Sequence, residues 1–194
     1  MENISPLRNA LLAGLAALAV AGCAADPPEP GFKHAYSTAA ISAVRLDPAA
    51  ATAAINTYRA GKGLRPVRID PALTAMAERQ AKAMAASGAL SHEVAGSFSS
   101  RLAGSGIDTT EAGENLGGGY MSLGEAMDGW RGSPGHDANL RIADATRFGV
   151  AIAKNPNGQY GVYWAMEIAA EPRPPARAGE GAFLPISGGA TRPQ

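Results

Sequence analysis

The chain has 194 residues, and its 17 Lys and Arg residues balance its 17 Asp and Glu residues, so the formal net charge is zero. This length fits one domain with two tails better than two domains. Because the chain has no run of Lys or Arg to neutralise phosphates, we exclude a nucleic-acid-binding protein.

Residues 1–22 have the pattern of a bacterial lipoprotein signal peptide. Arg8 supplies a positive charge, and residues 10–21 form an apolar run that is too short to span a bilayer. The chain's single cysteine, Cys23, follows Val20-Ala21-Gly22, which resembles a lipobox. We therefore expect Cys23 to be lipidated and the mature chain to be anchored to a membrane. Ordinary secretion, with Cys23 a bystander, is the alternative.

Residues 23–46 and 171–194 are predicted to be tails. The first segment is rich in Ala, Pro and Ser, which is typical of a tether, and we interpret His34 within it as a solvated side chain. The second is rich in Pro, Gly, Ala and Arg without a period, which is typical of disorder. Similarity to Gram-negative lipoproteins implies an outer-membrane address in the cell envelope, because Ala24 rather than Asp follows the cysteine.

Three helices are predicted between the tails. Asp47-Pro48 and Asp70-Pro71 each combine an N-cap with a first-turn proline, and apolar residues then recur at helical spacing. Gly88 predicts the end of the second helix. The third helix carries a stripe that ends at Trp130, which we interpret as a core anchor.

Strand signals come later in the chain. Residues 148–152 and 162–168 alternate large apolar side chains with other residues, and Asn155-Pro156-Asn157-Gly158 supplies a turn between them. A shorter strand is predicted near residues 107–116. Helices followed by a hairpin predict an α+β domain, residues 47–170, with helices packed on a small antiparallel sheet.

Three polar residues stand out from the surrounding Ala, Gly and Leu: His92, Glu114 and His136. Two neutral imidazoles and a carboxylate suit a divalent metal such as zinc, provided that folding brings them together and leaves a coordination position open. Each residue also has a purely structural interpretation. His92 could cap a helix end, Glu114 could accept turn amides, and His136 could be a hydrogen-bonded side chain.

Five segments, in this order, resemble the bacterial branch of the CAP (or SCP) superfamily, which includes cysteine-rich secretory proteins. They are Asn56-Thr57-Tyr58-Arg59 with Gly63-Leu64-Arg65-Pro66, then Ser91-His92, Gly113-Glu114-Asn115-Leu116, Trp130 with Ser133-Pro134-Gly135-His136, and Tyr163-Trp164. The resemblance implies a three-layer α/β/α sandwich. It also implies a His-Glu-Glu-His arrangement, of which this chain lacks the second glutamate, because Ser133 stands there.

The resemblance favours a non-enzymatic, lipid-anchored envelope protein whose His/Glu groove binds a metal ion, a lipid or another envelope component. A metal-dependent hydrolase, with Glu114 as its catalytic base, is a second hypothesis that the missing acid weakens. A purely structural envelope component is the third. No HExxH, G-x-S-x-G or P-loop pattern is present to suggest another enzyme class.

Overall fold

The structure is a computed structural model that describes residues 35–172. The predicted signal peptide, Cys23, His34 and residues 173–194 lie outside the described residues. None of the helices in the described part is both long and apolar enough to cross a membrane. The elements, in chain order, are α1 (Thr38–Ala43), α2 (Pro48–Ala60), β1 (Arg68–Ile69), α3 (Pro71–Ser87), α4 (Phe98–Gly104), β2 (Ala112–Gly118), α5 (Leu123–Gly132), α6 (Pro134–Leu140), β3 (Ala145–Asn155) and β4 (Gly161–Ala170).

The four strands form one sheet in the order β1-β3-β4-β2. β3 and β4 make the predicted antiparallel hairpin, and β2 pairs antiparallel with β4. The sheet is mixed rather than wholly antiparallel, because β1 runs parallel to β3. Sequence reasoning missed β1, since two residues are too few to show an alternation.

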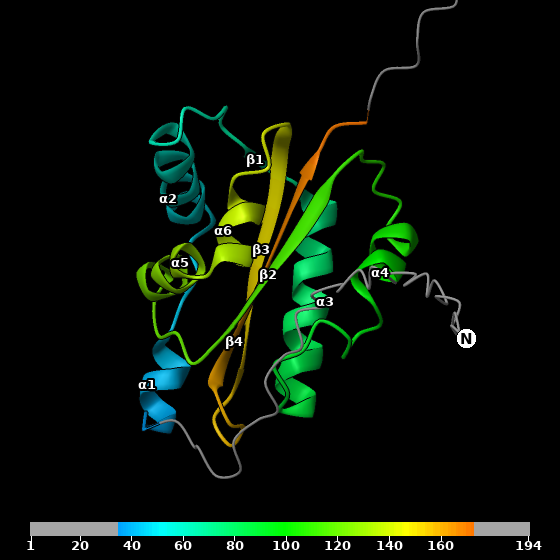
Figure 1. The fold of residues 1–194 in the computed structure, drawn as a ribbon. Helices are drawn as coiled ribbons and strands as arrows, with labels where there is room; N and C mark the ends of the chain where they lie inside the picture. The colour runs from blue at the N-terminus through cyan, green and yellow to red at the C-terminus, as the bar shows by residue number, and fades with distance from the viewer. Residues whose placement is uncertain (1–34, 173–194) are drawn as a thin grey trace, which may run out of the picture. The chain divides into compact units, whose positions relative to one another are not determined.

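Helices cover both faces of this sheet: α3 and α4 lie on one face, and α1, α2, α5 and α6 on the other (Figure 1). Every residue of the central strand β4 is buried between these layers. The predicted α+β sandwich is therefore confirmed. Trp130 is fully buried, and its Nε1 donates a hydrogen bond to the carbonyl of Leu116 at 2.9 Å, which fits its predicted role as a core anchor.

The helix boundaries follow the predicted capping signals. The carboxylate of Asp47 accepts from the amide of Ala49 at the start of α2, and Asp70 accepts from two amides at the start of α3. Gly88 ends α3 in the left-handed conformation, with φ at 75°. The backbone of α3 packs directly on β3 at Gly149, where a Cβ atom would lie 2.1 Å from the amide nitrogen of Thr74.

The domain extends beyond its predicted limits of 47–170. The short helix α1 lies within the predicted tether, and both Ile41 and Val44 are buried in the core. At the other end, Glu171 pairs with Arg68, with 2.8 Å between Oε1 and Nη2. The prediction missed α1 because a six-residue helix is too short to show a clear period.

Candidate functional site

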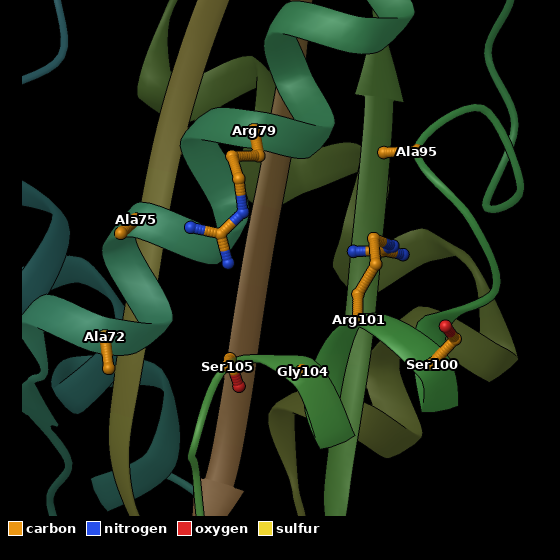
Figure 2. Close-up of a pocket in the computed structure, with 8 residues that line it drawn as sticks. All are labelled: Ala72, Ala75, Arg79, Ala95, Ser100, Arg101, Gly104 and Ser105. Atoms are coloured by element: carbon orange, nitrogen blue, oxygen red, sulfur yellow. The ribbon is translucent and has the colours of Figure 1, made fainter.

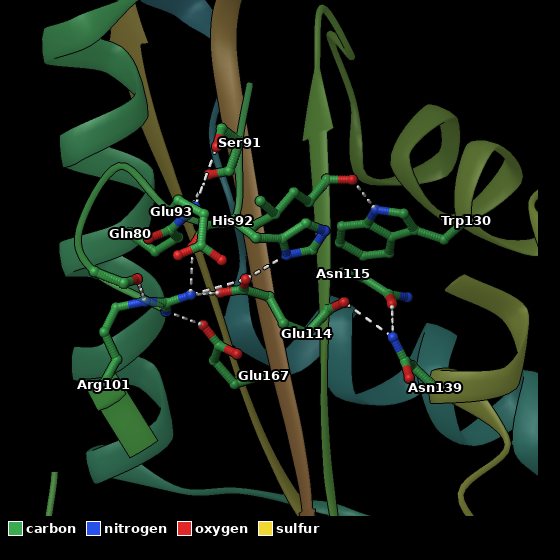
Figure 3. A network of polar contacts seen from close by, with 12 residues as sticks. Gln80, Ser91, His92, Glu93, Arg101, Glu114, Asn115, Trp130, Asn139 and Glu167 are labelled. Carbon is green, nitrogen blue, oxygen red and sulfur yellow. Dashed lines mark hydrogen bonds and ion pairs between the residues drawn. The ribbon is translucent and has the colours of Figure 1, made fainter. Parts of the chain in front are cut away.

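The three predicted site residues lie on different elements. His92 is in the loop between α3 and α4, Glu114 is inside β2, and His136 is in the first turn of α6. Glu114 lies in the strand that was predicted near residues 107–116, so the alternative in which it accepts amide hydrogen bonds from a turn does not apply. Nδ1 of His92 lies 2.6 Å from Oε1 of Glu114 (Figure 3). His136 bonds to neither residue, but it is near enough for the charge of His92 to affect its pKa.

Arg101, on α4, holds Glu114 from the other side. Its Nη2 donates to both carboxylate oxygens of Glu114, at 2.8 and 2.7 Å, and its Nη1 lies 3.5 Å from Oε1 of Glu167. The three side chains are at most 6% exposed. We call Arg101, Glu114 and Glu167 the arginine clasp (Figure 3).

The clasp also holds the loop that carries His92. Nε of Arg101 donates to the carbonyl of Gly96 at 2.9 Å, and Nη2 donates to the carbonyl of His92 at 3.2 Å. One buried guanidinium therefore connects α4, the loop before it and two neighbouring strands. This is the fork geometry for which arginine is better suited than lysine.

The two glutamates of the clasp are directly opposite one another on β2 and β4. Burial, together with the nearby charge of Glu114, raises the pKa of Glu167 to about 10. Burial alone would also raise the pKa of Glu114, but hydrogen bonds with His92 and Glu167 and the charge of Arg101 outweigh it, so that this pKa is lowered. At neutral pH the clasp therefore contains one anion, one cation and one neutral acid.

The hydrogen bond to Glu114 sets the tautomer of His92. An ionised carboxylate can only accept, so Nδ1 of His92 carries the proton and donates it to Oε1. Nε2 is then the nitrogen with the free lone pair when the ring is neutral. The side chain of His92 is 48% exposed, whereas that of Glu114 is only 2% exposed. The imidazole therefore covers a carboxylate that solvent barely reaches.

His136 is placed by a separate set of amide contacts. Nδ2 of Asn115 donates to the carbonyl of His136 at 3.0 Å, and Nδ2 of Asn139 donates to the carbonyl of Glu114 at 2.9 Å. These bonds join α6 to β2. Burial, and then the charge of His92, lower the pKa of His136, which keeps the ring neutral at neutral pH.

The predicted metal ligands do not fit a zinc-type site as they are arranged. Among residues 35–172, no group of three His, Cys, Asp or Glu side chains is placed to hold a metal ion. Both oxygens of Glu114 accept from Arg101, and Nδ1 of His92 faces the same carboxylate. Metal binding by His92, Glu114 and His136 stays a prediction from sequence that this geometry does not favour.

Sequence reasoning missed Arg101 and Glu167. Glu167 carries the only charge in β4, whose other polar side-chain groups are the hydroxyl of Tyr163 and the indole N–H of Trp164. An isolated acid in a buried strand is a usable signal. Arg101 gave no comparable signal, because α4 is short and has no apolar stripe.

The profile of the cysteine-rich secretory protein family (CAP) matches residues 52–168. The chain belongs to the CAP family. Among curated proteins, none matches it.

Solved structures of bacterial proteins share the fold. An extracellular SCP-domain protein from Bacillus anthracis matches with a TM-score of 0.55 and 23% identity, over 63% of this chain and 40% of that one. A cysteine-rich secretory protein from Staphylococcus aureus matches with a TM-score of 0.53 and 15% identity, over 64% of this chain and 38% of that one. An outer surface protein from Borrelia burgdorferi matches with a TM-score of 0.57 and 18% identity, over 65% of this chain and 96% of that one.

The CAP domain of this chain therefore corresponds to about two fifths of the first two proteins and to nearly all of the third. At these identities the likeness shows the fold alone.

Proposed function

We propose that this CAP domain is a non-enzymatic binding module of the bacterial cell envelope, anchored to a membrane through a lipid on Cys23. The arginine clasp is the observation that supports a non-enzymatic role. A general base must reach a substrate proton, and its pKa should lie near the working pH. Glu114 is buried, both of its oxygens are bonded to Arg101, and its pKa is lowered. It therefore has the properties of a structural anion.

The two histidines remain available for binding. His92 is half exposed, and within the described residues the ring of His136 has no hydrogen-bond partner. Nε2 of His92 can accept a hydrogen bond, and the neutral ring of His136 can both donate and accept, which suits a polar ligand or an envelope partner. Because the clasp and the Asn115 and Asn139 bonds hold both segments on the sheet, the pair is presented on a rigid scaffold.

Two kinds of observation support the envelope location. Cys23 follows an apolar segment of signal-peptide length at a sequence that resembles a lipobox. Two of the similar structures are an extracellular protein and an outer surface protein. A diacylated or triacylated cysteine would hold the chain on a membrane, since a single acyl chain binds only reversibly.

The Glu114→Gln variant tests the non-enzymatic role. We expect the purified wild-type protein to show no hydrolysis of ester, amide or phosphodiester substrates that depends on Glu114. We also expect the variant to unfold at lower denaturant concentration, because the clasp loses its anion. If the wild-type protein turns over a substrate, and Glu114→Gln abolishes this activity without changing the unfolding midpoint, Glu114 is a catalytic base. That result would refute the proposal.

The Cys23→Ser variant tests the anchor. We expect it to move from the membrane fraction to the soluble fraction of the cells that express it, whereas Ala24→Ser, which keeps the thiol, should stay with the membrane. If Cys23→Ser remains in the membrane fraction as fully as Ala24→Ser does, the lipid anchor is wrong.

A further inference from the structure

A pocket of about 470 Å³ lies between α3 and α4, and neither His92 nor His136 lines it. Half of its lining residues are Ala or Gly, which leaves room for a ligand, and none is acidic. Figure 2 shows the residues that line it: Ala72, Ala75, Arg79, Ala95, Ser100, Arg101, Gly104 and Ser105.

Arg79 provides the charge of this pocket. Its side chain leaves α3 and points into the space between α3 and α4 (Figure 2). Within residues 35–172 its guanidinium has no ion pair or hydrogen bond, and the acid next to it, Glu78, is paired with Lys82 at 3.2 Å. The five N–H donors of Arg79 are therefore not satisfied by the described protein.

The opposite wall contributes a hydroxyl group. Arg101 lines the pocket, but its guanidinium already donates to the carbonyl of Gly96 and to the carboxylate of Glu114. The hydroxyl of Ser105 donates to the carbonyl of Leu102 at 2.6 Å. Ser100 is exposed on α4 and lines the pocket, and within the described residues its hydroxyl donates no hydrogen bond.

We infer that this pocket binds a phosphate group. Its donors come from two walls, a guanidinium fork on α3 and a hydroxyl on α4. A planar carboxylate uses both of its oxygens on one such fork, whereas a tetrahedral phosphate has further oxygens for the second wall. The lack of any acidic residue in the lining removes the repulsion that would oppose an anion. The source is either free phosphate or the headgroup of a phospholipid, and the inference does not depend on the role of His92 and His136.

Titration of the wild-type protein with two probes tests this inference. The probes are inorganic phosphate and vesicles that contain phosphatidylglycerol, with phosphatidylcholine vesicles for comparison, and the readout is the amide NMR shifts of α3 and α4. We expect Arg79→Gln to weaken binding by about tenfold or more. The matched control is Lys82→Gln, which removes the same charge from the same helix outside the pocket, and it should change binding by less than about twofold. Ser100→Ala, on the other wall, should weaken binding by about threefold.

Each result decides the inference. If inorganic phosphate saturates the shifts, free phosphate is a sufficient ligand. If phosphatidylglycerol vesicles saturate them and inorganic phosphate does not, the ligand is a phospholipid headgroup. Either result supports the inference. Equal losses for Arg79→Gln and Lys82→Gln would mean that only overall charge matters, which overturns it. Failure of both probes to shift any amide of α3 or α4 overturns it as well. Arg79 is exposed, so we expect Arg79→Gln to unfold at the wild-type midpoint, and Ser100→Ala provides an independent check.

Discussion

Two arginines are buried on opposite sides of the sheet, and their charges are balanced in different ways. Arg59, on α2, is fully buried. Among residues 35–172, its guanidinium donates only to backbone carbonyls, those of Arg65, Leu140, Ile142 and Ala145. Arg101, on α4, is 9% exposed and donates to carboxylates as well as to carbonyls.

This difference separates a structural cation from one that belongs to the candidate site. Arg59 satisfies carbonyls at the end of α6 and before β3, where the partial negative charge of a helix C-terminus favours a cation. Burial, and then the charge of Arg65, lower its pKa. Arg101 instead neutralises Glu114 and holds the loop of the exposed His92. Arg101 therefore contributes to the candidate site, because its ionisable partner Glu114 contacts the exposed His92. The carbonyl partners of Arg59 are not ionisable.

Loss of Arg101 should have the largest effect on stability. Arg101→Met leaves Glu114 and Glu167 buried without a cation, and we expect the free energy of unfolding to fall by about 3–5 kcal/mol. Urea denaturation measures this loss. Arg101→Lys keeps the charge without the fork, so it should recover only part of the stability. A loss below about 1 kcal/mol for Arg101→Met would contradict the clasp as a structural unit.

Loss of Arg59 should have a smaller effect that does not depend on pH. Arg59→Met leaves several buried carbonyls without donors, and we expect a loss of about 2–3 kcal/mol in the same denaturation experiment. Because its partners are carbonyls, which do not titrate, the difference from wild type should be the same at about pH 5 and about pH 8. A loss that changes between these pH values would show that Arg59 also balances an ionisable group.

An effect of the opposite sign is expected for Glu167→Gln, which should stabilise the protein. Folding raises the pKa of Glu167 from 4.5 to about 10, so the folded state holds a proton that the unfolded state releases as pH rises above 4.5. Stability from this group therefore falls between these two pH values. Glutamine resembles the protonated acid and keeps an oxygen for Arg101, so urea denaturation at about pH 8 should show the variant to be more stable than the wild type.

Urea denaturation of Glu167→Gln at lower pH tests the contribution of Glu114, whose pKa shifts in the opposite direction. Because folding lowers this pKa from 4.5, the stability that Glu114 contributes is present above 4.5 and is lost as the pH falls below it. The Glu167→Gln variant should therefore still lose stability as the pH falls below 4.5, but it should no longer lose stability as the pH rises above 4.5. If the variant still loses stability as the pH rises, a group other than Glu167 is responsible.

Local sequence signals predicted the elements with clear caps or periods. The Asp-Pro starts of α2 and α3, the left-handed Gly88 and the β3–β4 hairpin all follow from contacts within a few residues. The elements that were missed, α1, α4 and β1, are too short for a period to be visible and are held by tertiary packing.

For the candidate site, His92, Glu114 and His136 can be predicted from the sequence, because they are unusual residue types within family motifs. The role of Glu114 depends on the three-dimensional structure. Its partners, Arg101 and Glu167, come from a different helix and a neighbouring strand. Hydrogen bonds and ion pairs depend on distances in space, and a carboxylate enclosed by a guanidinium has the same sequence neighbours as one that is open to solvent.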